Sequence, residues 1–162
     1  MPWNNSVWRP GNSSMNIQPD FEEFLRLLED HAVDYMIVGG YAVAFHGVPR
    51  FTKDIDVFYH NSPANIDRLR RALVEFGFSD KEMPSSLFAE RGNIIAFGVA
   101  PVRIDLVNDI DGVTFEEAKS NAVRGNYGHV DVPFIGRQDL LRNKRATSRA
   151  RDKADAEELE QQ

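Results

Sequence analysis

Apolar residues recur at helical spacing in two long stretches of the chain, with polar residues between them. The two stripes consist of Phe21, Phe24, Leu25 and Leu28, and of Ile66, Leu69, Leu73 and Phe76. Each predicts an amphipathic helix. A capping box is expected at Asp20 and Glu23 in the first helix, and the second is expected to begin after Ser62 and to end at Gly77.

Short apolar or alternating stretches predict strands. They lie at Tyr35–Val38, Asp54–Tyr59, Asn93–Val99, Val102–Val107 and Val130–Phe134. Further helices are expected at Tyr41–His46, from Thr114 to about Ala122, and from Arg137 onward. Helices and strands interleave without regular βαβ spacing, which indicates an α/β (α+β) fold with a mixed sheet.

The 162 residues fit one domain of ordinary size. Residues 1–18 are rich in Asn, Ser, Pro and Gly, and they are expected to form a disordered or extended tail. Residues 19–162 are expected to form the single domain, including a basic helical segment over 137–162.

Composition excludes several classes of protein. The chain has no cysteine, so disulfide frameworks, thiolate nucleophiles and cysteine zinc sites are absent. No apolar run approaches the roughly 20 residues needed to span a bilayer, and no secretory signal is visible. A cytoplasmic protein with no membrane partner is expected.

Charge is unevenly distributed. The net charge is −6, but the segment from Arg137 to Lys153 carries seven basic and two acidic residues, which is +5 and leaves −11 for the remainder. Such a segment on an acidic body indicates a local anion site or an intramolecular partner for the acidic part.

The most informative chemistry is the pair Asp54 and Asp56. Residues i and i+2 of a strand share a face, so the two carboxylates are expected to project together. Adjacent carboxylates repel each other unless a cation lies between them, and aspartate is a poor strand former. The pattern therefore favours a hard cation such as Mg²⁺.

Asp105 repeats this pattern on a later strand, where it shares a face with Arg103. If the two strands are neighbours, Asp105 completes a three-carboxylate cluster able to hold two metal ions about 3.5–4 Å apart. Arg103 could contact a phosphate or neutralise a carboxylate.

Gly39-Gly40 follows a strand and precedes a helix. Such a turn leaves backbone N–H groups free for an anion, with no side chain in the way. Neither the P-loop nor the three-glycine dinucleotide pattern is present. The diglycine becomes informative when it is combined with the strand aspartates.

Together, these motifs resemble the nucleotidyltransferase superfamily of the DNA polymerase beta type. More narrowly, the chain is similar to small bacterial nucleotidyltransferase-like proteins, some of which belong to abortive-infection or toxin–antitoxin systems. The stretches that carry the resemblance are Val38–Ala42, His46-Gly47, Arg50, Thr52–Asp56, Arg103–Leu106, Phe115–Ala118 and Lys144–Asp155. The resemblance implies a minimal polymerase-beta-like core, a mixed sheet flanked by helices.

The resemblance also implies roles for particular residues. Asp54, Asp56 and Asp105 would bind two Mg²⁺ ions, with Mn²⁺ as a substitute, and Asp105 would help to deprotonate the attacking hydroxyl. The triphosphate of an NTP would lie along Gly39 and Gly40. Further phosphate or acceptor contacts are expected from Arg50, Thr52, Lys53, Arg103 and Lys144.

Two function classes remain open at this point. The first is an Mg²⁺-dependent nucleotidyltransferase that transfers NMP from an NTP to an acceptor hydroxyl on a small molecule, a protein or an RNA end, with release of pyrophosphate. The second is a non-catalytic module that binds a nucleotide or an antitoxin-like partner protein. A metal-dependent phosphodiesterase or nuclease is a weaker third alternative.

Overall fold

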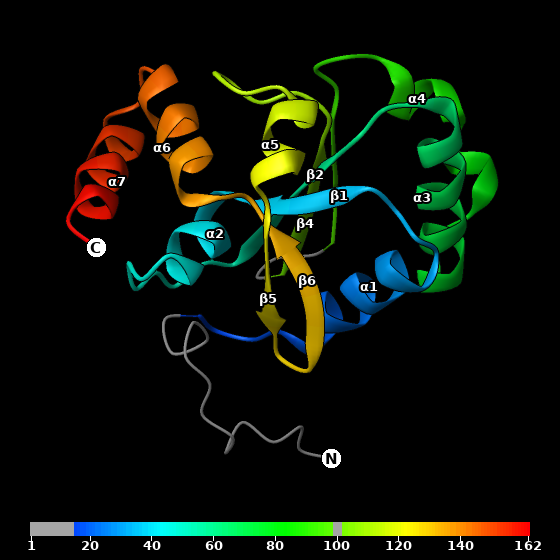
Figure 1. The fold of residues 1–162 in the computed structure, drawn as a ribbon. Coiled ribbons are helices and arrows are strands. Elements are labelled where there is room, and N and C mark those ends of the chain that lie inside the picture. Colours follow the sequence, from blue (N-terminus) through cyan, green and yellow to red (C-terminus); the bar gives the residue numbers. More distant parts are fainter. Residues whose placement is uncertain (1–14, 99–101) are drawn as a thin grey trace.

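The computed structural model describes residues 15–98 and 102–162 (Figure 1). The helices are α1 (Pro19–Asp30), α2 (Gly39–Phe45), α3 (Pro63–Phe76), α4 (Ser85–Ala89), α5 (Phe115–Asn121), α6 (Arg137–Ala146) and α7 (Ala150–Glu160), with a 3₁₀ turn, η1, at Asp80–Glu82. The strands are β1 (Tyr35–Val38), β2 (Asp54–Tyr59), β3 (Ile94–Phe97), β4 (Arg103–Val107), β5 (Val123–Tyr127) and β6 (Val130–Phe134).

The strands form one mixed sheet in the order β3-β4-β2-β1-β6-β5. At its centre β1 runs antiparallel to β2, whereas β2 and β4 are parallel and so are β1 and β6. Both edge strands, β3 and β5, are antiparallel to their neighbours. The mixed sheet with flanking helices confirms the predicted α/β fold class.

Helices cover both faces of the sheet (Figure 1). On one face α1 and α3 pack over Ile37, Ile55 and Val57 in one apolar cluster. The other face is covered by α2, α5, α6 and α7, whose apolar residues join Met36 and Phe58 in a second cluster. Because side chains alternate along a strand, β2 contributes to both layers.

Several local predictions are confirmed and others are wrong. The Ser62 side chain caps α3, and Thr114 forms a complete capping box with Glu117 at the start of α5. At α1, however, Asp20 lies inside the helix; Gln18 is the N-cap residue and its side chain makes no capping hydrogen bond. Pro19 occupies the first helical position, where its missing N–H would have had no partner within the helix and its fixed φ suits the helix.

Strand β5 was not predicted from the sequence. Its residues include Gly125 and few apolar side chains, so no alternating pattern marks it. A Cβ atom at Gly125 would lie 2.4 Å from the Phe45 ring, which stacks on Phe134 with 4.0 Å between ring centroids. Glycine is needed there for close ring approach, and this need hides the strand in the sequence.

Residues 1–14 of the predicted tail lie outside the described residues, as do residues 99–101 between β3 and β4. The last tail residues that are described contact the domain. Asn16 donates a hydrogen bond to the Thr52 carbonyl, and the Gln18 backbone N–H donates one to the Tyr127 hydroxyl. In the described part of the chain, no helix has both the length and the apolar character to cross a bilayer.

Candidate active site

Strand β2 places Asp54 and Asp56 on one face of the sheet. Ile55 and Val57 between and after them are fully buried on the opposite face, against α1 and α3. The alternation expected from the sequence therefore holds. Because the apolar residues fix which face of β2 is buried, they also fix the direction of both carboxylates.

Strand β4 brings the third carboxylate beside them. It lies next to β2 in parallel, with Asp56 opposite Asp105 and Asp54 opposite Arg103. Ile104 and Leu106 are buried on the far face, so Asp105 projects on the same side as the β2 carboxylates. Asp105 is itself only 8% exposed.

The electrostatics of this arrangement are unfavourable at Asp56. Burial, followed by the charges of Asp105 and Asp54, raises the pKa of Asp56 to about 7. Within residues 15–98 and 102–162, no basic side chain forms an ion pair with it. A cation placed among these carboxylates would relieve the repulsion.

Arg103 lies between the other two carboxylates. Its Nη2 atom lies 3.4 Å from Asp54 Oδ2 and donates a hydrogen bond of 3.0 Å to Asp105 Oδ2. Its Nε atom lies 3.0 Å from Asp105 Oδ1 without the alignment of a hydrogen bond, so this buried oxygen has no hydrogen-bond donor. These contacts, with Asp105 first, raise the pKa of the Arg103 guanidinium above its ordinary value.

The diglycine turn lies directly against Asp56. Gly39 has φ of +70°, and a Cβ atom there would lie 2.2 Å from Asp56 Oδ2. A Cβ at Gly40 would lie 3.3 Å from the Thr52 side chain. Thr52 in turn accepts a hydrogen bond from the Asp54 backbone N–H. The first turn of α2 can therefore lie this close to β2 only if residue 39 is glycine, and a side chain at residue 40 would press on Thr52.

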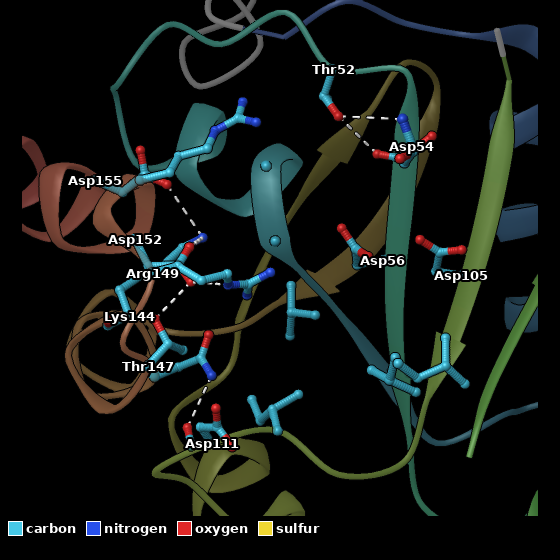
Figure 2. Close-up of a pocket in the computed structure, with 18 of the residues that line it drawn as sticks. Thr52, Asp54, Asp56, Asp105, Asp111, Lys144, Thr147, Arg149, Asp152 and Asp155 are labelled. Carbon is cyan, nitrogen blue, oxygen red and sulfur yellow. Dashed lines mark hydrogen bonds and ion pairs between the residues drawn. The ribbon is translucent and has the colours of Figure 1, made fainter. Parts of the chain in front are cut away.

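Helices α6 and α7 form the opposite wall, as Figure 2 shows. Lys144 is only 7% exposed, and its Nζ atom lies 3.0 Å from Asp152 Oδ1 and 3.3 Å from Asp155 Oδ2. Asp155 also pairs with Arg50 from the loop before β2. Burial alone would raise the pKa of Asp152, but hydrogen bonds from Thr147 and Lys144 hold it below the ordinary value. This wall is a buried ionic network.

A cavity of about 510 Å³ separates the two walls (Figure 2). It is lined by these expected site residues: Gly39, Gly40, Arg50, Thr52, Asp54, Asp56, Arg103, Asp105 and Lys144. Lys53, also expected there, is exposed and does not line the cavity. Lys53 lies in a bend immediately before β2, so the strand does not direct its side chain.

The remaining residues that line the cavity were not predicted as site residues from the sequence. Arg149, Arg151, Asp152 and Asp155 line the cavity, together with an apolar group that includes Ile94, Val107 and Ile110. A signal was present for two of them: Asp152 and Asp155 lie on the same helix face as buried Leu159. Two carboxylates on a buried stripe need a cationic partner.

The chemistry of the donor set fits a divalent cation. Carboxylate oxygens are the ligands that Mg²⁺ prefers, and Asp105 Oδ1 is a buried oxygen that accepts no hydrogen bond. As the side chains stand, no group of three or more His, Cys, Asp or Glu in residues 15–98 and 102–162 is arranged so that it could hold a metal ion. Arg103 lies against two of the three carboxylates in this arrangement.

Comparison with known proteins agrees with the fold and the motifs. Residues 18–161 match a protein family described as "Nucleotidyl transferase of unknown function (DUF2204)". The chain belongs to this family. It is therefore a nucleotidyltransferase-like protein, as the resemblance in the sequence implied. A search of curated proteins gives no significant match.

Two solved structures show the same fold. One is a candidate nucleotidyltransferase from Thermotoga maritima, with a TM-score of 0.56, 15% identity, and coverage of 91% of this chain and 94% of that one. The other is an antigenic nucleotidyltransferase-like protein from Paracoccidioides brasiliensis, with a TM-score of 0.50, 17% identity, and coverage of 88% and 75%. At sequence identities this low, the comparison shows a shared fold and nothing finer.

Proposed function

We propose that the protein is an Mg²⁺-dependent nucleotidyltransferase that transfers the NMP part of an NTP to an acceptor hydroxyl. One observation carries the proposal. Three carboxylates from neighbouring strands and a diglycine turn meet in one cavity, which a buried lysine also lines. Membership in a nucleotidyltransferase family supports the same conclusion.

Asp54, Asp56 and Asp105 are the residues that would hold the metal ions, with Mn²⁺ as a substitute for Mg²⁺. When bound, the ions would neutralise charge on the phosphates and on the attacking oxygen. The raised pKa of Asp56 supports this assignment, because a divalent cation would favour the ionised carboxylate that burial disfavours.

The remaining residues would bind and orient the nucleotide. The triphosphate would lie along Gly39 and Gly40, where only backbone faces the cavity, and close to Arg50 and Thr52. Lys144, held in place by two carboxylates, would face the phosphates from the opposite wall. Positioning and charge neutralisation supply most of the catalysis in reactions of this kind.

In the reaction, an oxygen of the acceptor forms a bond to the α-phosphorus while the bond to pyrophosphate breaks. The acceptor hydroxyl must lose its proton, and Asp105 would receive it. The two phosphate groups of the leaving pyrophosphate would remain paired with the basic side chains of the cavity until release.

The test is incubation with each α-labelled NTP and Mg²⁺ or Mn²⁺, in which pyrophosphate release and labelling of acceptors or of the protein itself are measured. We expect Asp56→Asn to abolish the signal. Asp109→Asn is the matched control, because it removes a carboxylate from the edge of the same cavity but not from the strand cluster. A signal that survives Asp54→Asn and Asp56→Asn would refute the assignment.

The contact of Arg103 with Asp54 and Asp105 favours a second candidate, a module that binds a nucleotide or a partner protein without turnover. In such a module the guanidinium would replace the metal ions permanently. Tight NTP binding with no pyrophosphate release under any metal would support this candidate over the enzyme.

A further inference from the structure

The side chain of Arg103 lies against two of the three strand carboxylates, Asp54 and Asp105. Residue 103 lies two positions before Asp105 on β4 and opposite Asp54 on β2, so the sheet register itself brings the guanidinium to both carboxylates. The contacts of 3.0 Å and 3.4 Å engage one oxygen of Asp54 and both oxygens of Asp105. These are the oxygens that a divalent ion would need.

The contact with Arg103 neutralises only part of the negative charge of the three carboxylates. One positive charge faces three carboxylates, Asp105 Oδ1 still accepts no hydrogen bond, and Asp56 has no ion pair with any basic side chain in the described ranges. A divalent ion carries twice the charge and approaches oxygen more closely than a guanidinium does. It therefore attracts these oxygens more strongly than the arginine does and can compete for them.

The side chain of Arg103 also has room to move away from the carboxylates. Its side chain is 51% exposed, so it can turn into the open cavity without disturbing the core. Exposed side chains change rotamer within nanoseconds. Lys144 differs in this respect, since its side chain is 9% exposed and is bonded to two buried carboxylates.

We infer that Arg103 is an internal counter-ion that competes with divalent metal for Asp54 and Asp105. In the metal-free protein it holds the carboxylates together, and metal binding requires it to move away. The inference rests on the metal site of the proposed function. It adds that the affinity for metal is set in part by an arginine of the same chain.

The test is the affinity for Mn²⁺ alone, measured in the absence of nucleotide by the loss of the electron paramagnetic resonance signal of free Mn²⁺. Arg103→Gln removes the competitor, and we expect it to bind Mn²⁺ roughly 2- to 30-fold more tightly than the wild type, from the strength of two ion pairs made by a half-exposed arginine. Arg103→Lys keeps the charge but loses the forked contact, so an intermediate gain is expected.

Arg149→Gln is the matched control. Arg149 lines the same cavity and is exposed, but its ion pair is with Asp152 on the opposite wall. If general loss of positive charge explains the effect, this control will gain as much affinity as Arg103→Gln, and Arg103→Lys will equal the wild type. Either of these two results would overturn the inference.

Thermal unfolding with and without Mn²⁺ gives a second test that does not rely on the measured affinity. Without metal, Arg103→Gln should melt at a lower temperature than the wild type, and saturating Mn²⁺ should raise its melting temperature by more than it raises that of the wild type. An equal rise in the two proteins would contradict competition.

The two proposals fail in different ways. If neither the wild type nor any Arg103 variant binds Mn²⁺, the metal site of the proposed function is wrong, and the inference is wrong with it. If the wild type binds Mn²⁺ but the Arg103 variants bind it no more tightly, only the inference is wrong.

Discussion

Replacing Asp56 by asparagine tests the electrostatics of the carboxylate cluster directly. Burial and the neighbouring carboxylates raise the pKa of Asp56 from 3.8 to about 7 in the folded protein. Between these two values the folded state binds more protons at Asp56 than the unfolded state does. The free energy of unfolding of the metal-free wild type therefore falls as the pH rises from about 4 to about 7.

The size of the effect follows from the pKa difference. Each unit corresponds to 1.36 kcal/mol, so Asp56 costs the folded protein up to about 4 kcal/mol once the pH exceeds 7. Asparagine has nearly the same shape but cannot ionise. In EDTA, Asp56→Asn should therefore match the wild type near pH 4 and exceed its stability by up to about 4 kcal/mol at pH 8.

Urea unfolding followed by circular dichroism at several pH values gives this difference, because contributions shared by both proteins cancel. Asp131→Asn, at an exposed position of β6, is the control for the loss of one carboxylate elsewhere. Saturating Mg²⁺ should stabilise the wild type and leave Asp56→Asn nearly unchanged. A stability difference that is the same at every pH would refute the reasoning.

Three further predictions concern the stability of the metal-free protein, measured by urea unfolding. Gly39→Ala should lower the free energy of unfolding by more than the roughly 1–3 kcal/mol expected from left-handed backbone strain, because its Cβ would also meet a carboxylate of β2. Gly92→Ala is the control: Gly92 has φ of +91° and open space around it, so this substitution measures the backbone strain alone. Equal losses would contradict the predicted clash. Lys144→Met should lower the free energy of unfolding by up to about 3–5 kcal/mol, because it removes the buried cation that Asp152 and Asp155 share and leaves each with a single arginine, whereas exposed Lys153→Met should change it little. A loss at Lys144 no larger than that at Lys153 would show that the network contributes no stability. Thr114→Ala should cost about 1 kcal/mol through loss of the capping box, and an unchanged unfolding midpoint would show that the cap is dispensable.

The cavity wall built from the sheet was predictable because its signal is local. The two-residue period of β2 sets the direction of Asp54 and Asp56, and the same period on β4 sets that of Asp105. That the two strands are neighbours could only be hypothesised, because strand order depends on contacts between distant parts of the chain. The structure confirms this pairing, with Asp56 opposite Asp105.

The opposite wall could not be predicted in the same way. Arg149 and Asp152 are three positions apart, the spacing of an ordinary ion pair on a helix surface, and this spacing alone does not tell whether Asp152 faces solvent. Only the packing of α7 on α6 buries Asp152 and Asp155 around Lys144. Strand β5 was missed for a related reason, since Gly125 is explained by the distant Phe45 ring.

The two walls of the cavity come from distant parts of the chain, and this fixes the order in which they appear during synthesis. All strands of the sheet leave the ribosome before α6 and α7 do, so the acidic wall exists first and faces water without its basic partner. A nascent chain halted before residue 137 would expose an uncovered acidic groove. The basic wall, and with it the complete cavity, is present only once α6 and α7 have been synthesised.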